Sequence, residues 1–273
     1  MQEIVGYIGF VLIGVLLGLV GGGGSILALP VLVFLFHILP ADATAYSLFV
    51  VGITSLAGSF TCIRRGDFNA EAIFLFGIPS LLSIYFTREF IIPNIPEVLS
   101  VTPKFSIQKE ILILISFSFV MIFSAFSMIR KSSQEKRNDL LIGELFNTPL
   151  KVPIVVFLGL TVGFISGFVG AGGGFMIIPV LVVLLRIPMK KSIGTSLIII
   201  SVNSLVGFFG ASGHLKTDWN FLLEVSALAI TGILVGRYIS NYISGKKLKP
   251  FFGWLALFVG ITILIEEILT IKN

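Results

Sequence analysis

The sequence predicts an all-α polytopic membrane protein built from two homologous halves, and three observations predict it. Of the 273 residues, 56% are hydrophobic and 12% are charged, whereas a soluble domain carries roughly 25% charged residues. The apolar residues gather into about eight long blocks, which correspond to roughly 8–10 helical membrane segments. A glycine-rich block occurs twice, at matching positions of the two halves. We therefore expect a multi-pass protein of the plasma membrane.

Six of the apolar blocks have the length of a single span, which needs roughly 20 residues. They lie at about 44–62, 72–87, 111–129, 193–213, 221–243 and 251–269. The blocks 4–36 and 152–185 are too long for one span. Each contains an apolar arm, a run of glycines and a second arm with a proline. Each long block is therefore either one kinked span or a hairpin that enters and leaves on the same side.

The distribution of basic residues distinguishes these two arrangements. If each long block crosses once, Lys and Arg divide 10 to 9 between the two sides; if each is a hairpin, they divide 14 to 5. The positive-inside rule favours the hairpins, with both termini outside. The halves are then inverted about an axis in the membrane plane, as in many secondary transporters. We expect a first transmembrane repeat at 1–129, a cytoplasmic linker at 130–151 and a second repeat at 152–273.

The repeat is clearest around the glycines. Residues 18–36 and 167–185 are identical at ten of nineteen positions with a constant offset of 149. Gly14 and Gly18 match Gly163 and Gly167, and small residues at this spacing let membrane helices approach closely.

The glycine runs also indicate a site for an anion. Where a broken helix restarts, its first amides lack partners and carry a partial positive charge. Glycines let an anion approach such amides, because no side chain intervenes. We expect Ser25 and Gly174 to begin the restarted arms, so that two helix N-termini face each other. The alternative is that the glycines only allow tight helix packing.

Polar residues that follow the breaks extend this prediction. They could bind an oxyanion, although a lone Ser or Thr in a membrane helix often bonds its own backbone. The candidate substrate-binding residues are Gly21, Gly22, Gly23, Gly24, Ser25, Ser47, Gly170, Gly172, Gly173, Gly174, Thr195, Ser196 and Asn203. Asp67 and Asp218 are expected to be N-caps of the helices that follow them.

The sequence lacks the motifs that are typical of other classes of function. The helix centres contain almost no ionisable groups. This argues against proton coupling through a side chain and against catalysis within the membrane. Neither glycine run has the Lys-Ser or Lys-Thr of a P-loop. With one cysteine, Cys62, and two distant histidines, we expect no disulfide, metal or cofactor. The net charge of +5 is a topology signal here rather than a sign of nucleic-acid binding.

The chain resembles the sulfite exporter TauE/SafE family of permeases over nearly its whole length. The resemblance rests on GLVGGGGSILALPVL and GFVGAGGGFMIIPVL, on the triplets AYS at 45–47 and GTS at 194–196, and on the GDF and TDW turns. It implies seven to nine spans and transport of small sulfur-containing anions such as sulfite, thiosulfate or organosulfonates. It identifies neither the anion, nor the direction, nor a coupling ion.

Two features depart from the repeat and from the family pattern. The first half carries an insertion at 89–110, and Thr87-Arg88 stands where the second half has Gly236-Arg237. We therefore expect the two halves to contribute unequally to the site. An anion channel and a non-transporting accessory membrane subunit remain alternatives, although an accessory subunit would not need two matching glycine breaks.

Overall fold

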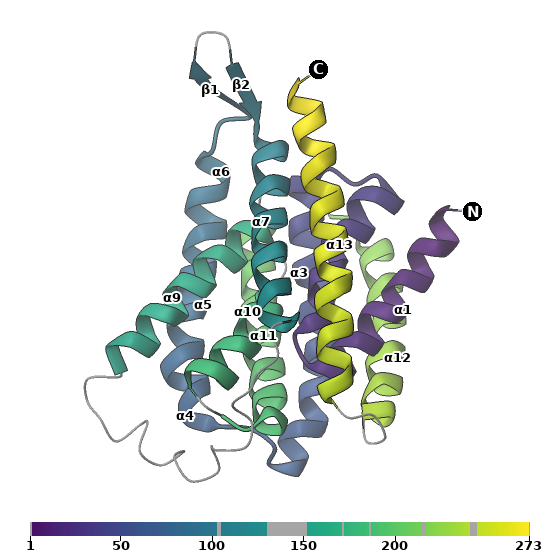
Figure 1. Ribbon diagram of the computed structural model, residues 1–273, viewed down its shortest axis with the longest axis vertical. Helices are drawn as coiled ribbons and strands as arrows, with labels where there is room; N and C mark the ends of the chain where they lie inside the picture. Colours follow the sequence, from purple (N-terminus) through teal and green to yellow (C-terminus); the bar gives the residue numbers. More distant parts are fainter. Residues whose placement is uncertain are drawn as a thin grey trace.

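The computed structural model describes residues 2–102, 105–129, 152–170, 172–185, 187–213, 217–240 and 245–272. Long helices form a bundle, and one small β-hairpin projects from its end (Figure 1). Within the described part, six helices are long and apolar enough to cross a membrane. The predicted linker at 130–151 lies outside the described residues. The prediction of an α-helical polytopic membrane protein is confirmed.

The first half contains three long helices, a broken span and several short helical turns between them. Its elements are α1 Gln2–Val20, η1 Gly23–Leu27, α2 Ala28–Pro30, η2 Val31–Leu35, α3 Pro40–Arg65, α4 Ala70–Ala72, η3 Ile73–Gly77, α5 Ile78–Phe86, η4 Thr87–Ile91, α6 Ile92–Asn94, β1 Val98–Thr102, β2 Phe105–Gln108 and α7 Lys109–Ile129. The segment from α4 to α6 is a continuous candidate span, Ala70–Asn94.

The second half has a similar order of elements. It comprises α9 Val152–Val169, α10 Gly174–Pro179, η5 Val180–Leu184, α11 Met189–Ser212, α12 Trp219–Ser240 and α13 Gly245–Lys272. The arm after each glycine break contains a proline that is followed by a π-helical turn, η2 or η5. Proline has no backbone N–H to donate, so the regular bonding of the helix is interrupted there.

In the first half, the chain turns back along α1 after the glycine break. Gly24 packs against the backbone of Ile13 and Leu17, and the ring of Phe36 lies 5.4 Å from the ring of Tyr7. The end of the second arm therefore lies beside the beginning of the first. This is the arrangement that the hairpin interpretation requires.

The second half begins the same turn. Gly173 lies against Val162 and Ser166 of α9, and these three positions are the counterparts of the Gly24 contacts at the offset of 149. The turn at the second break thus begins with contacts equivalent to those at the first.

Each half supplies a helix that packs on the other half. A side chain on Gly14 of α1 would collide with the carbonyl of Ala229 in α12, and one on Gly163 of α9 would collide with the carbonyl of Ser80 in α5. The same offset of 149 relates Gly14 to Gly163 and Ser80 to Ala229. The small residues therefore allow close helix contact, as predicted, and the contact joins the halves.

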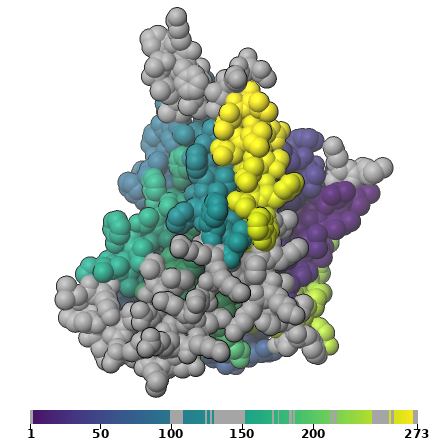
Figure 2. Space-filling view, in the orientation of Figure 1, coloured from purple at the N-terminus to yellow at the C-terminus, as the bar shows by residue number. Residues whose placement is uncertain are grey.

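The helices α7 and α13 pack along each other on one face of the molecule, where Figure 2 shows them in teal and yellow. Large apolar side chains are exposed on the outer helix faces, among them Ile4, Ile8, Leu12, Phe119, Phe123, Trp254, Phe258 and Ile265. An exposed apolar surface of this extent is expected in a protein surrounded by lipid.

The insertion at 89–110 contains structure that the sequence reading did not foresee. It completes the helical span and then forms the antiparallel pair β1–β2, which projects beyond the helices (Figure 1). Both its strands are short, and the pair lies at the same end of the molecule as the C-terminus.

The predicted N-cap residue is observed in the second half only. Asp218 caps α12, since its side chain accepts a hydrogen bond from the Phe221 amide at 3.2 Å. In the first half the cap is Asn69, which accepts from the Ala72 amide at 2.8 Å. Asp67 instead forms an ion pair with Lys190 at 3.1 Å, so its predicted role as a cap is wrong.

Candidate functional site

The two glycine breaks meet inside the bundle. Gly22 precedes η1, and Gly174 begins α10. A side chain on either residue would collide with the backbone of the other; a Cβ on Gly174 would lie 2.7 Å from the Gly22 Cα. The breaks therefore touch, and the expected gap between two facing N-termini is closed here. At this contact, the glycines serve tight packing.

A polar group lies beside the second break, at Gly170. Gly170 has φ +77°, a conformation that favours glycine. Its carbonyl accepts a hydrogen bond from the Ser47 hydroxyl, which also bonds the Thr44 carbonyl at 2.9 Å. A side chain on Gly170 would collide with Thr44. The break of the second half is thus held against the start of α3 in the first half.

Arg88 is the charged residue of this group. It lies in η4 and is only 1% exposed. Its Nη1 donates a hydrogen bond to the Thr44 hydroxyl at 2.9 Å, and its Nη2 lies 2.7 Å from the position that a Cβ on Gly170 would occupy. Glycine at 170 therefore provides the space for the guanidinium.

One edge of the Arg88 guanidinium has no protein partner among the described residues. Its Nε and Nη2 are buried and have no hydrogen-bond partner among the described residues. These two nitrogens donate in parallel from the same edge, a geometry that matches two oxygens of one oxyanion. A buried charge without a partner costs several kcal/mol. This edge is therefore suited to receive an anion.

Four buried hydroxyls also lack partners in the described part of the chain, and two of them lie beside the second break. The four belong to Ser55 of α3, Ser166 of α9, Ser204 of α11 and Ser226 of α12. Ser204 lies against Gly172, and the Ser166 hydroxyl is 2.8 Å from the Cβ position of Gly173. Ser55 and Ser204 are counterparts at the offset of 149. Buried polar atoms are normally paired, so these hydroxyls can bond a ligand.

Other predicted site residues have bonds of their own. The Ser25 hydroxyl donates to the Gly22 carbonyl at 2.8 Å, and the first short helix begins at Gly23 rather than Ser25. Gly174 begins its arm as predicted. Gly24 packs on α1. These contacts stabilise the turn of each break.

The predicted polar residues of α11 are divided among different contacts. Thr195 accepts a hydrogen bond from the Asn69 amide at 2.8 Å, and Asn203 donates to the Ser80 hydroxyl at 2.7 Å. Both fasten α11 to the first half. Ser196 faces the other break, where its hydroxyl lies 3.1 Å from the Cβ position of Gly21. Thr195 and Asn203 are not brought together with Arg88.

The sequence reading missed Arg88 and Thr44 as a pair. The predicted apolar block ends at residue 87, which places Arg88 in the loop that follows it. The available signal was an arginine flanked on both sides by apolar helix-forming sequence, in a span that continues to Asn94. Such an ionisable residue inside a span indicates a functional site by default.

The described residues contain no group of three or more His, Cys, Asp or Glu side chains that could hold a metal. Beside Gly170, the described polar groups are the Arg88 guanidinium, hydroxyls and backbone groups.

Comparison with known proteins agrees with this membrane architecture. Residues 7–263 match the family described as "Sulfite exporter TauE/SafE". A "Probable membrane transporter protein" of Methanocaldococcus jannaschii is 30% identical over 256 residues, covering 89% of this chain and 87% of the relative. A protein of the same description from Xylella fastidiosa strain Temecula1 is 26% identical, with 93% and 91% covered.

A third relative, the "Probable membrane transporter protein YunE" of Bacillus subtilis, is 26% identical over 282 residues, covering 94% of this chain and 97% of the relative. No solved structure matches the chain significantly. The family match covers most of the chain, and the helices have the length and apolarity of membrane spans. The chain therefore belongs to the sulfite exporter TauE/SafE family and is a multi-pass membrane transporter of the plasma membrane.

Proposed function

We propose that the protein is a secondary transporter that carries small sulfur-containing anions, such as sulfite, thiosulfate or organosulfonates, across the plasma membrane. The family description supports this substrate class. The observation that carries the proposal is the Nε–Nη2 edge of the buried Arg88, which has no hydrogen-bond partner among the described residues. The anion binds this edge beside Gly170, and no enzymatic step is part of the function.

The charge of the site fits a small anion. Arg88 is deeply buried and forms no ion pair among the described residues, so a bound anion neutralises it. Thr44 accepts from Nη1 while its own hydroxyl donates to the Ala41 carbonyl at 2.6 Å. These two bonds fix the guanidinium with its free edge available, which is the kind of preorganisation that favours binding.

The hydroxyls and the break supply the remaining contacts. Ser166 and Ser204 lie beside Gly172 and Gly173 and can donate to oxygens that the guanidinium does not bind. Ser47 positions the Gly170 carbonyl rather than the anion. Of the predicted residues, Gly170, Gly172 and Gly173 thus form the backbone wall of the site.

We further propose that residues 1–129 and 152–273 are inverted repeats joined by a cytoplasmic linker. The equivalent contacts of Gly24 and Gly173 and the exchanged packing of Gly14 and Gly163 support this relation. So does the excess of Lys and Arg on the linker side. Inverted repeats let a transporter open to each side in turn around one substrate site.

The test is transport by the purified protein in proteoliposomes, measured as flux of labelled sulfite, thiosulfate and sulfoacetate with and without ion gradients. Arg88→Met should abolish saturable flux, and Arg88→Lys should retain a part of it, because an ammonium keeps the charge without the two-pronged geometry. Arg64→Met is the matched control, since Arg64 is an exposed arginine that packs over Phe60.

Each outcome bears on a different part of the proposal. Flux that is unaltered in Arg88→Met removes Arg88 from the site. Flux that increases without saturation indicates an anion channel. A wild-type protein that is folded but moves none of the three anions under any gradient argues for another substrate class or for an accessory subunit.

A further inference from the structure

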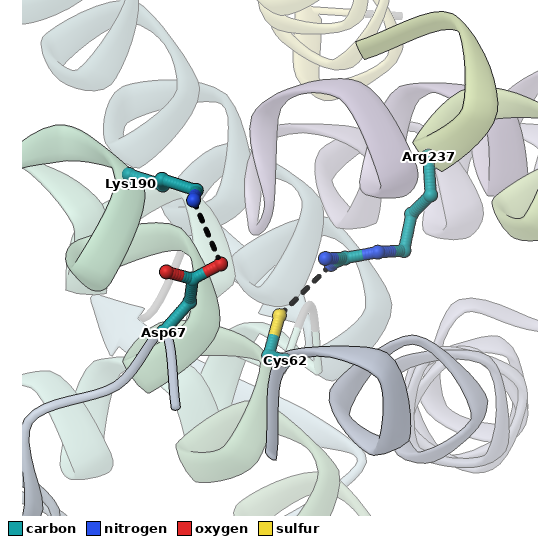
Figure 3. A network of polar contacts seen from close by, with 4 residues as sticks. All are labelled: Cys62, Asp67, Lys190 and Arg237. Carbon is teal, nitrogen blue, oxygen red and sulfur yellow. Dashed lines mark hydrogen bonds and ion pairs between the residues drawn. The ribbon is translucent and has the colours of Figure 1, made fainter. Parts of the chain in front are cut away.

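Arg237 of α12 is the counterpart of Arg88 at the offset of 149. Its Nη1 donates a hydrogen bond to the Cys62 sulfur at 2.9 Å, and its side chain is partly buried. Figure 3 shows the guanidinium pointing toward Cys62, while the neighbouring Asp67 points toward Lys190. The two arginines are thus related by the repeat but have different partners.

No carboxylate among the described residues forms an ion pair with Arg237. Lys190–Asp67 is the one ion pair among the described residues, so Asp67 is already engaged with another cation. The thiol of Cys62 is a weak hydrogen-bond acceptor. Arg237 therefore has a charge that an anion can neutralise.

Elements of the Arg88 site recur beside Arg237. Gly21 has φ +85°, as its counterpart Gly170 has φ +77°. Ser196 faces Gly21 as Ser47 faces Gly170. The Arg237 backbone nitrogen would lie 2.8 Å from a Cβ on Gly18, three residues before Gly21. A glycine break, a hydroxyl and an arginine thus occur together in both halves.

The two arginines lie toward opposite ends of α3. Arg88 bonds Thr44 near its start, and Arg237 bonds Cys62 near its end. These partners are 18 residues apart, which corresponds to about 27 Å along a helix. This is close to the thickness of the hydrocarbon core, roughly 30 Å.

We propose that Arg237 is a second anion-binding station, at the end of the pathway opposite Arg88, for the same class of small oxyanion. This inference rests on the proposed function. An anion that leaves Arg88 binds Arg237 in place of the Cys62 sulfur before it reaches solvent.

The experiment combines equilibrium binding of labelled sulfite by the purified full-length protein with its flux in liposomes. The variants are Arg88→Met, Arg237→Met and the double variant, with Arg64→Met as a control at the same end as Arg237. Melting temperatures in detergent identify variants that fail to fold. If Arg237→Met fails to fold, the conservative variant Arg237→Lys replaces it.

We expect Arg88→Met to retain weak, saturable binding that the double variant lacks. In Arg237→Met, the dissociation constant of the tighter site, at Arg88, should stay within about twofold of the wild type. The maximal flux should fall about tenfold or more and recover in part in Arg237→Lys. If folded Arg88→Met binds no sulfite, or if Arg237→Met matches the wild type in flux, the second station is wrong while the Arg88 site stands. If the wild type binds no sulfite, both proposals fail together.

Discussion

At the scale of single residues, the orientation of Arg88 depends on Thr44. The Thr44 hydroxyl has one hydrogen, which it donates to Ala41, and it therefore faces Arg88 as an acceptor. It bonds Nη1 and leaves Nε and Nη2 together on the open side. A neutral residue thus determines which edge of the cation is presented to the substrate.

Thr44→Val keeps the shape of the side chain and removes this acceptor. We expect the dissociation constant of sulfite to rise about tenfold, corresponding to about 1.4 kcal/mol, because the guanidinium loses its fixed orientation. Thr44→Ser should stay within about twofold of the wild type. Titration of labelled sulfite onto the purified variants measures both, and an unchanged constant in Thr44→Val would disprove the orienting role.

The sequence predicted single residues well where one residue type has few possible roles. Of the five described glycines at positive φ, four are predicted site residues, Gly21, Gly170, Gly172 and Gly173, and the fifth, Gly66, caps the end of α3. Polar residues were harder, because a hydroxyl or amide can bond many partners. Asn203 bonds Ser80, which is 123 positions away, and a pattern within one helix contains no information on such a partner.

At the scale of helices, the glycines of α1 and α9 set the distance between the halves. Their backbones approach the carbonyls of α12 and α5 with no side chain between them. The spacing of Gly14 and Gly18 predicted a close helix contact, but not which helix would be the partner. That choice depends on how the two halves exchange their first helices, which is a property of the tertiary structure.

Gly14→Ala should destabilise the protein, because the added Cβ would collide with the Ala229 carbonyl. Overpacking of this kind typically costs about 1–3 kcal/mol. Gly9→Ala is the matched control in the same helix, since its Cβ would lie 3.4 Å from the nearest atoms of Val31. Thermal unfolding in detergent should give a lower midpoint for Gly14→Ala alone. Equal midpoints for the two variants would exclude the close contact.

At the scale of the whole molecule, the described helices place the two arginine groups at different ends. Cys62, Asp67 and Lys190 mark one end, and Arg88 and the β1–β2 hairpin mark the other. The count of basic residues predicts that the first end is cytoplasmic. The sequence could predict this arrangement because charge bias acts on whole loops and does not require knowledge of packing.

Cysteine labelling in intact cells tests the orientation. In a Cys62→Ser background, Glu97→Cys should react with a membrane-impermeant maleimide, because residue 97 is exposed beside the hairpin. Arg64→Cys, exposed at the other end, should react only after the membrane is permeabilised. The reverse pattern would invert the orientation, and reaction of both sites in intact cells would place both ends outside.

The contact between Gly22 and Gly174 has a consequence for the membrane potential. A membrane potential of 100 mV stores about 2.3 kcal/mol for each elementary charge that crosses, and a continuous column of water through the protein would dissipate it. Where the backbones of the two breaks touch, no side chain separates them, and we expect this contact to leave no room for such a column at this point of the bundle.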